Sequence, residues 1–146
     1  VRPFNVAGPG QSSRGGFVLP RFIEQAIAGA PLTVFGDGGA VRAFTHVEDV
    51  AVGLVLAMER GISGRAYNIG NPKNRTTILA LARAVLAVTG SPSPVSFVNP
   101  KELFGPGFED AADKYPDSSR AEAELGWMPT RDLERIIGDT WLSYRS

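Results

Sequence analysis

The stretch VRPFNVAGPGQSSRGG, at residues 1–16, decides the fold class of this chain. Residues 1–6 are a short apolar run of the kind that forms a buried strand, and the glycine- and serine-rich string after them is typical of a loop. A central strand of an α/β sheet needs a ladder partner on each side. Because a domain rarely begins in its own central strand, we expect further sequence to precede Val1 in the whole protein.

Helical and extended patterns alternate along the rest of the chain. Apolar residues recur with the period of an amphipathic helix at 17–28, 47–58, 76–86 and 131–144. Short apolar runs predict strands at 31–35, 42–47, 66–70 and 95–98. GDGG at 36–39 predicts a turn, 100–113 a loop, and Ser118 or Ser119 the cap of a short helix that ends at Leu125. This alternation predicts one α/β domain.

The composition is that of an ordinary soluble protein. The 146 residues are 43% hydrophobic and 21% charged, and no apolar run approaches the roughly 18 residues that a membrane span needs. Lysine and arginine (15) balance aspartate and glutamate (15), so no overall field steers the chain toward nucleic acid or an anionic membrane. The absence of cysteine excludes disulfides and thiolate sites. We expect a cytoplasmic protein without nucleic-acid or membrane partners, in which an anionic ligand needs locally placed cations.

Four segments, in this order, resemble one protein family. They are RPFNVAGPGQ at 2–11, LTVFGDGGAVRAFTHVEDVA at 32–51, AYNIGNP at 66–72 and PDSSRAEAELGWMPTRDLE at 116–134. Together they resemble the second half of an NAD-dependent epimerase/dehydratase of the extended short-chain dehydrogenase/reductase family. The resemblance implies an α/β fold built from the last strands of an incomplete Rossmann sheet and a smaller substrate-binding lobe. Residues 1–146 would then form one unit, and NAD would bind mainly to an N-terminal part outside it.

The resemblance also implies a substrate class. The stretch GPGFEDAADKYPDSSRAEAELGW at 105–127 is most similar to UDP-glucuronate decarboxylases, and a UDP-hexose 4-epimerase is the alternative within the family. In such enzymes NAD oxidises the sugar at C4, and the 4-keto intermediate then permits epimerisation, elimination or loss of a carboxylate. The expected partner of this chain is therefore a UDP-linked nucleotide sugar, which it would select and orient.

Three residues of the resembling segments are the main candidates for ligand contacts. Arg42 follows the glycine turn on a strand, where a guanidinium can bind phosphate oxygens, and the resemblance assigns it the diphosphate. The alternative is a surface arginine paired with Glu48 or Asp49. The resemblance implies that Asn5 contacts the substrate and that Phe4 borders the nicotinamide of the cofactor. The alternative for these two is a turn asparagine beside a core phenylalanine.

Four further residues complete the expected substrate site. The resemblance implies that Val34 and Phe35 flank the nucleotide base through packing and backbone hydrogen bonds. Phe108 falls where the decarboxylases have a tyrosine, so it can stack but cannot donate a hydroxyl hydrogen bond. Lys114 falls where they have an arginine near the sugar carboxylate, and lysine keeps the charge without the planar fork. These two departures weigh against decarboxylation in particular.

Two signatures of the family are absent from these 146 residues. The dinucleotide fingerprint is a glycine-rich turn between a strand and a helix, whereas GDGGA at 36–40 lies between two predicted strands. The catalytic Tyr-x-x-x-Lys pair is missing, because no tyrosine has a lysine four residues later. His46, the only histidine, has no metal-ligand spacing and is interpreted as structural. We assign no catalytic or metal-binding residue and expect the chain to be inactive alone.

Three interpretations remain open from the sequence. The chain is the substrate-binding portion of a nucleotide-sugar enzyme, a non-catalytic module that binds a nucleotide sugar or a protein, or an unrelated α/β domain with matching turns. In the first two, the open edge of the first strand predicts self-association into a homo-oligomer.

Overall fold

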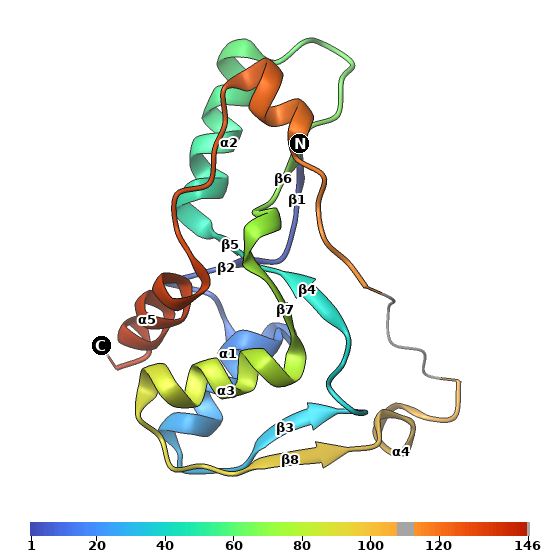
Figure 1. Ribbon diagram of the computed structural model, residues 1–146, viewed down its shortest axis with the longest axis vertical. Coiled ribbons are helices and arrows are strands. Elements are labelled where there is room, and N and C mark those ends of the chain that lie inside the picture. The colour runs from blue at the N-terminus through green and yellow to red at the C-terminus, as the bar shows by residue number, and fades with distance from the viewer. Residues whose placement is uncertain (108–112, 146) are drawn as a thin grey trace.

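The computed structural model describes residues 1–107 and 113–145, in which short strands and helices alternate (Figure 1). The strands are β1 (Arg2–Pro3), β2 (Val6–Ala7), β3 (Leu32–Phe35), β4 (Val41–Ala43), β5 (Thr45–His46), β6 (Asn68–Ile69), β7 (Arg75–Thr77) and β8 (Val95–Val98). The helices are α1 (Val18–Ile27), α2 (Val47–Arg60), α3 (Ile78–Thr89), α4 (Pro100–Phe104) and α5 (Leu133–Ser143). Short helical turns are η1 (Ser13–Gly15), η2 (Pro72–Asn74) and the π-helical η3 (Ala121–Leu125).

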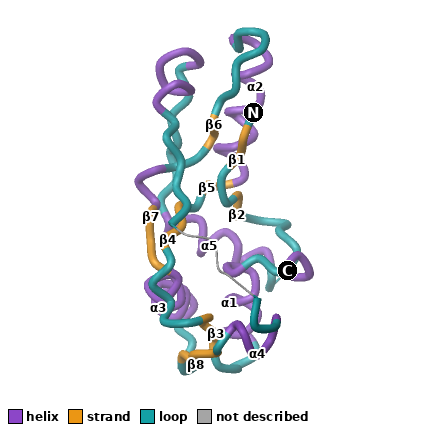
Figure 2. Tube along the Cα trace, turned by 90° about the vertical axis from the view of Figure 1, so that its right-hand side faces the viewer, coloured by secondary structure: helices purple, strands orange, loops and turns teal. Residues whose placement is uncertain are grey.

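The described strands pair in four two-stranded ladders rather than in one continuous sheet. The pairs β1–β6, β2–β5 and β3–β8 are parallel, and β4–β7 is antiparallel. Parallel partners need crossover connections, and the helices α1, α2 and α3 lie within these connections. Figure 1 and Figure 2 both show α1, α3, β3 and β8 in one half of the molecule and α2, β1 and β6 in the other. The α/β fold with incomplete sheets is therefore confirmed.

Each half of the molecule has its own hydrophobic cluster. The larger one joins α1, β3, α3 and α5, and α1 contributes Leu19, Phe22 and Ile23 at helical spacing. The smaller one joins α2, β6 and η3 through residues that include Ile69 and Trp127. Full burial of one such side chain stabilises the fold by about 1.5–3 kcal/mol. The larger cluster therefore fixes the position of α1 against β3, on which the site described below depends.

The opening run forms two strands instead of the single buried strand predicted for residues 1–6. Arg2 and Pro3 in β1 are exposed, and the strand direction changes at Asn5, which has a φ of +36°. A left-handed backbone is more accessible to asparagine than to other residues with a Cβ. This change moves the chain from β6, the partner of β1, to β5, the partner of β2.

The predicted strand 42–47 is also interrupted, at the buried residue Phe44. The backbone N–H of Phe44 donates to the carbonyl oxygen of Asn74 at 3.3 Å, so β4 pairs with β7 while β5 pairs with β2. The helix α2 then begins directly at Val47. A change of ladder partner depends on contacts far along the sequence, and the local apolar pattern does not report it.

The predicted loop 100–113 and the predicted serine cap need correction as well. The side chain of Asn99 accepts from the backbone N–H of Lys101 and starts the helix α4, with proline in the first turn. Ser118 does not cap the next helical segment with its side chain, because its hydroxyl donates to the carbonyl oxygen of Gly70 at 2.6 Å. The side chain of Asp117 accepts from Ser119 N–H at 2.9 Å instead.

One face of α2 is apolar and exposed to solvent. Val52 and Val55 are each 52% exposed, and Met58 is 87% exposed. The helix runs along the edge of the upper half in Figure 1. No helix of the described residues, α2 included, is long and apolar enough to cross a membrane. Exposed apolar patches of this kind are typical of contact surfaces between proteins.

We expect the isolated chain to self-associate through α2. Light scattering coupled to size exclusion should give a mass that rises above 15.5 kDa with protein concentration. The double variant Val55→Glu with Met58→Glu should shift the chain toward the monomer, because unpaired carboxylates oppose burial. Arg83→Ala, an exposed change on α3 in the other half of the molecule, should leave the association unchanged. A wild-type chain that stays monomeric at every concentration would contradict this expectation.

Candidate functional site

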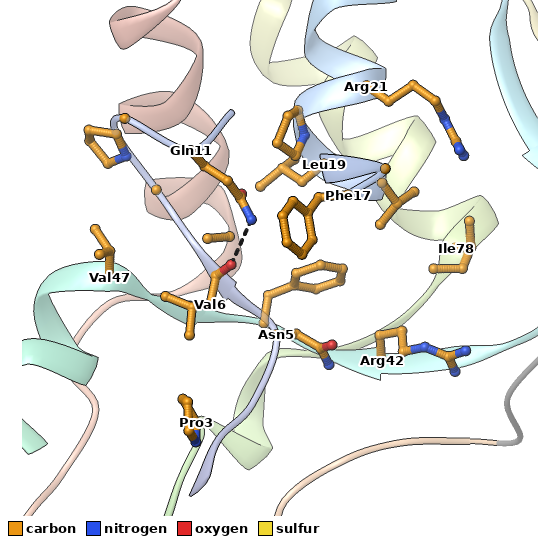
Figure 3. A pocket seen from close by; sticks show the side chains of 18 of the residues that line it. Pro3, Asn5, Val6, Gln11, Phe17, Leu19, Arg21, Arg42, Val47 and Ile78 are labelled. Atoms are coloured by element: carbon orange, nitrogen blue, oxygen red, sulfur yellow. Dashed lines mark hydrogen bonds between the residues drawn. The ribbon is translucent and has the colours of Figure 1, made fainter. Parts of the chain in front are cut away.

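A pocket of about 700 Å³ lies where the opening strands, the loop after β2 and the start of α1 meet β4 (Figure 3). The first segments contribute Pro3, Asn5, Val6, Ala7, Gly8, Pro9, Gly10, Gln11 and Gly16. The later elements contribute Phe17, Val18, Leu19, Pro20, Arg21, Phe35, Arg42, Phe44, Val47 and Ile78. The wall is mostly apolar, with a few amide and guanidinium groups. A concave surface of this composition is typical of a small-molecule site.

Asn5 is held at the base of this pocket by both its backbone and its side chain. Its Nδ2 donates to the carbonyl oxygen of Ala43 at 3.0 Å, and its own carbonyl oxygen accepts from Thr45 N–H at 3.2 Å. These bonds tie the turn between β1 and β2 to both β4 and β5. The amide group is therefore fixed beside the cation that β4 supplies, as Figure 3 shows for Asn5 and Arg42.

Arg42 lines the pocket from the middle of β4. Its backbone pairs with Thr76 in the β4–β7 ladder and bridges to Lys114 on the other side, so the strand position is fixed from both edges. The Nη1 group donates to the carbonyl oxygen of Val41 at 2.8 Å, and Arg42 makes further interactions as well. A guanidinium on a supported strand can present a defined fork to phosphate oxygens.

The alternative interpretation of Arg42 was a surface arginine paired with Glu48 or Asp49. Both of these carboxylates bind Arg131 instead. Arg131 Nη2 contacts Glu48, and Arg131 Nη1 donates to Asp49 Oδ1 at 2.7 Å. Asp49 is 3% exposed and also accepts from the backbone and hydroxyl of Thr130. Burial alone would raise the pKa of Asp49, but the hydrogen bonds from Thr130 and Arg131 outweigh it and hold this pKa below the usual value. This network is structural and lies outside the pocket wall.

A second guanidinium lines the pocket, that of Arg21 on α1, which is not among the predicted site residues. Its Cζ lies 4.4 Å from the ring centroid of Phe35, and its Nη2 donates to the carbonyl oxygen of Thr33 at 3.1 Å. Burial lowers the pKa of the Arg21 guanidinium. The only signal in the sequence is a pair of polar residues one helical turn apart, Arg21 and Gln25, beside the apolar stripe of α1.

The loop GPGQSSRGG, at residues 8–16, borders the pocket as an anchored segment. Gln11 Nε2 donates to the carbonyl oxygen of Val6 at 2.9 Å, and the hydroxyl of Tyr144 donates to the carbonyl oxygen of Gln11 at 2.6 Å. The Ser12 hydroxyl accepts from Arg14 N–H and starts η1. The predicted loop therefore borders the pocket, and α5 contributes the tyrosine that fixes it.

Gly8 shows why this loop needs glycine where it meets α2. Its φ is +144°, and a Cβ there would lie 2.8 Å from Val47 Cγ1.

His46 lies beside Gly8 and is fully buried, with Nδ1 accepting from Glu48 N–H at the start of α2. Its Nε2 lies 3.3 Å from Asp139 Oδ2 without forming a hydrogen bond. These positions agree with the structural interpretation of His46.

The structure brings three of the predicted site residues into the pocket wall, Asn5, Phe35 and Arg42. Val34 does not join them, because it alternates with Phe35 on β3 and is fully buried in the core. Phe4 lies outside the wall too. Its backbone N–H donates to the carbonyl oxygen of Ile69, and its Cβ packs near Gly70.

The two remaining predicted contacts lie on the segment between α4 and η3. Lys114 is exposed, and its backbone N–H donates to the carbonyl oxygen of Val41 at 3.0 Å, beside the strand that carries Arg42. Asp113 Oδ1 accepts from Val41 N–H at 3.0 Å. Phe108 lies outside the described residues. The segment at 113–114 is thus joined to β4, although the Lys114 side chain is not part of the pocket wall.

Comparison with known proteins gives one consistent family. Residues 1–70 match the NAD dependent epimerase/dehydratase family. Over 140 residues the chain is 35% identical to UDP-glucuronic acid decarboxylase 1 of Xenopus tropicalis, a match that covers 96% of this chain and 31% of that protein. The chain therefore spans about a third of the length of this relative.

Solved structures agree in fold. UDP-glucose 4-epimerase from Thermotoga maritima, solved with UDP-glucose, is 31% identical with a TM-score of 0.88 over 99% of this chain and 44% of that chain. UDP-glucuronic acid 4-epimerase from Bacillus cereus, solved with UDP-glucuronic acid and NAD, is 29% identical with a TM-score of 0.85. That match covers 99% of this chain and 44% of the epimerase chain.

Proposed function

The chain belongs to the NAD dependent epimerase/dehydratase family, and we propose that it forms the portion of such an enzyme that binds the nucleotide sugar. In this proposal residues 1–146 select and orient the substrate, while hydride transfer depends on groups elsewhere in the whole protein. The relatives named above are a UDP-sugar decarboxylase and two UDP-sugar 4-epimerases.

One observation supports this proposal most directly. Asn5, Phe35 and Arg42 come from separate strand segments, yet all line the same pocket. A nucleotide sugar presents a flat base, a diphosphate and a polyol. The Phe35 ring can pack against the base, the Arg42 guanidinium can bind the diphosphate, and the Asn5 amide can both donate to and accept from sugar hydroxyls. These three groups therefore suit the three parts of such a ligand.

NAD is the cofactor that the family description implies, but the glycine turn at 36–39 does not offer a site for its pyrophosphate. The glycine turn that contains Gly36 and Gly38 joins β3 to β4, so no helix N-terminus follows these glycines. A dinucleotide pyrophosphate normally binds at such a helix N-terminus. For this chain we therefore propose only that Phe4 borders the nicotinamide ring of NAD.

We further propose that the sugar carries a carboxylate. The backbone of Lys114 neighbours that of Arg42, which puts two cationic residues on adjoining segments near the pocket. A relative and a solved structure both carry UDP-glucuronic acid in their names. Lysine offers a point charge to a carboxylate rather than a bidentate fork, so Lys114 would orient the sugar less strictly than an arginine.

Thermal unfolding with added ligands tests the proposed function. UDP-glucuronate and UDP-glucose should raise the melting temperature by several degrees, because a ligand at about 100 times its Kd stabilises the folded form by roughly 2.7 kcal/mol. Free glucuronate should have no effect, since it lacks the diphosphate and the base. If Lys114 contacts the carboxylate, Lys114→Met should remove any preference for UDP-glucuronate over UDP-glucose. Unchanged melting temperatures with both UDP-sugars would show that the proposal is wrong.

A second experiment separates an enzyme portion from a binding module without turnover. Mixing the chain with the NAD-binding half of a related enzyme, UDP-glucuronate and NAD should convert UDP-glucuronate into an epimerised or decarboxylated UDP-sugar if the chain completes an active site. The product is followed by NMR rather than by NADH absorbance, because return of the hydride to the sugar regenerates NAD. Ligand binding without any conversion of the sugar, over a range of partner halves, would favour the non-catalytic module. The 146 residues contain no Tyr-x-x-x-Lys pair, so the chain without the partner half is the matched control.

A further inference from the structure

The guanidinium of Arg21 is fixed at the edge of β3 that faces away from β8. In this strand the N–H groups of Leu32 and Gly36 donate toward β8, so the backbone groups of the alternate residues Thr33 and Phe35 face the opposite edge. Gln25 on α1 accepts from Thr33 N–H at 3.1 Å, and Arg21 donates to the Thr33 carbonyl oxygen at 3.1 Å. Side chains of α1 therefore cover this edge at Thr33, and the pocket begins at Phe35.

The charge of Arg21 is not balanced within the described part of the chain. No carboxylate of the described residues forms an ion pair with it, and its buried Nε has no hydrogen-bond partner. A half-buried guanidinium without a counter-charge raises the free energy of the empty pocket. The buried Nε cannot be reached from the pocket, but a hydrogen-bond acceptor of a bound ligand can contact the Nη groups of Arg21, which lines the pocket wall.

The position of Arg21 also separates it from the cation assigned to the diphosphate. In Figure 3 the side chains of Arg21, Ile78 and Arg42 follow one another along one side of the pocket, with the apolar Ile78 between the two guanidinium groups. The Cζ atom of Arg21 lies over the ring of Phe35, 4.4 Å from its centroid, as in a cation–π contact. A flat heterocycle that packs beside Phe35 can therefore accept a hydrogen bond from the guanidinium.

We propose that Arg21 is a specificity-determining residue that donates a hydrogen bond to the C4 keto oxygen of a pyrimidine base bound against Phe35. This inference rests on the proposed function, because it assumes a nucleotide in the pocket. A guanidinium can only donate. Uracil and thymine carry a keto oxygen at C4, whereas cytosine carries an amino group there, so Arg21 favours the keto pyrimidines and opposes cytosine.

Binding of UDP, CDP and inorganic pyrophosphate to the chain and its variants, measured by calorimetry, tests this role. The wild-type chain should bind UDP about tenfold or more tightly than CDP, since a site built for one hydrogen-bond pattern rejects the mismatched one. Arg21→Met keeps much of the side-chain volume without the donors. It should weaken UDP binding about tenfold and leave CDP and pyrophosphate binding nearly unchanged, so that the UDP preference disappears.

Two further variants keep the result interpretable. Arg21→Lys provides the test if Arg21→Met does not fold. It keeps the charge, but one ammonium group cannot donate to both the Thr33 carbonyl and a base, so this variant should also lose the preference for UDP. Arg83→Met replaces an exposed arginine of α3 that lines no part of the pocket, and it should behave like the wild type.

The outcomes distinguish the two levels of the argument. Equal losses of UDP, CDP and pyrophosphate binding in Arg21→Met would mean that Arg21 contacts phosphate, and would overturn its assignment to the base. An unchanged preference for UDP in both Arg21 variants would overturn it as well, while leaving the proposed function intact. A wild-type chain that binds neither UDP nor UDP-glucuronate would overturn the proposed function and this inference together.

Discussion

Replacing Asp49 with alanine should destabilise the chain by about 3–5 kcal/mol, as is usual when one partner of a buried charged pair is removed. Its carboxylate accepts from the backbone N–H groups of Thr130 and Arg131, each at 3.1 Å, and from the Thr130 hydroxyl at 2.9 Å. It also accepts from Arg131 Nη1 at 2.7 Å. Alanine would leave these donors without an acceptor at a site where Asp49 is 3% exposed. Urea denaturation followed by circular dichroism measures the loss.

The contacts of Asp49 explain why a single residue has this effect. Asp49 lies in the first turn of α2, where a negative charge suits the helix dipole, and its backbone carbonyl accepts from Trp127 Nε1 at 2.8 Å. It thereby joins α2 to the segment that leads into α5. Glu59→Ala, on the exposed face of the same helix, should change stability by less than about 0.5 kcal/mol. A loss below about 1 kcal/mol for Asp49→Ala would show that the network relaxes at little cost.

The same residue sets an expected pH dependence. The pKa of Asp49 is lower in the folded chain than in the unfolded chain, so its contribution to stability is fully present above the unfolded pKa, at about pH 4. It is lost as the pH falls below that value and through the folded pKa. The wild-type chain should therefore lose stability more steeply than Asp49→Ala as the pH falls below about 4. Parallel pH profiles would contradict this assignment.

The elements that the sequence predicts well are those that local forces determine. Helix α1 shows its apolar stripe through Leu19, Phe22 and Ile23, and the following strand and glycine turn need only adjacent residues. Thr77 caps α3 with its side chain, at the start of the predicted helical range 76–86. The joint position of Asn5 and Arg42 in one pocket was expected from the resemblance, which carries tertiary information that the local patterns lack.

The features that the sequence does not predict depend on distant contacts. A charged residue on an amphipathic helix usually faces solvent, and only the packing of α1 across β3 turns Arg21 toward the pocket. Val34 was expected beside the base, but strand alternation directs its side chain into the core while Phe35 faces the pocket. The left-handed backbone of Asn5 likewise follows from its bonds to β4 and β5 rather than from its neighbours in sequence.

Replacing Arg42 with alanine should weaken the binding of UDP-glucuronate about 100-fold, because a charge-assisted, bidentate hydrogen bond to the diphosphate is lost. Arg42→Lys keeps the charge but not the fork, and it should lose about tenfold. The variants are compared by calorimetry at one fixed salt concentration, since exposed charges are screened by salt. Their melting temperatures without ligand should stay close to that of the wild type, which would show that the pocket itself is intact.

A neighbouring cation separates direct contact from a general electrostatic attraction. Arg75 lies opposite Ala43 in the β4–β7 ladder, outside the pocket wall. Its Cζ atom lies 3.6 Å from the ring centroid of Tyr115. Arg75→Ala should lower binding by less than about threefold, with an effect that vanishes at high salt. Uridine, which has no phosphate, should bind Arg42→Ala and the wild type equally. If uridine binding falls in parallel with UDP-glucuronate binding, Arg42 shapes the pocket instead of binding the diphosphate. The assignment of Arg42 to the diphosphate would then be wrong.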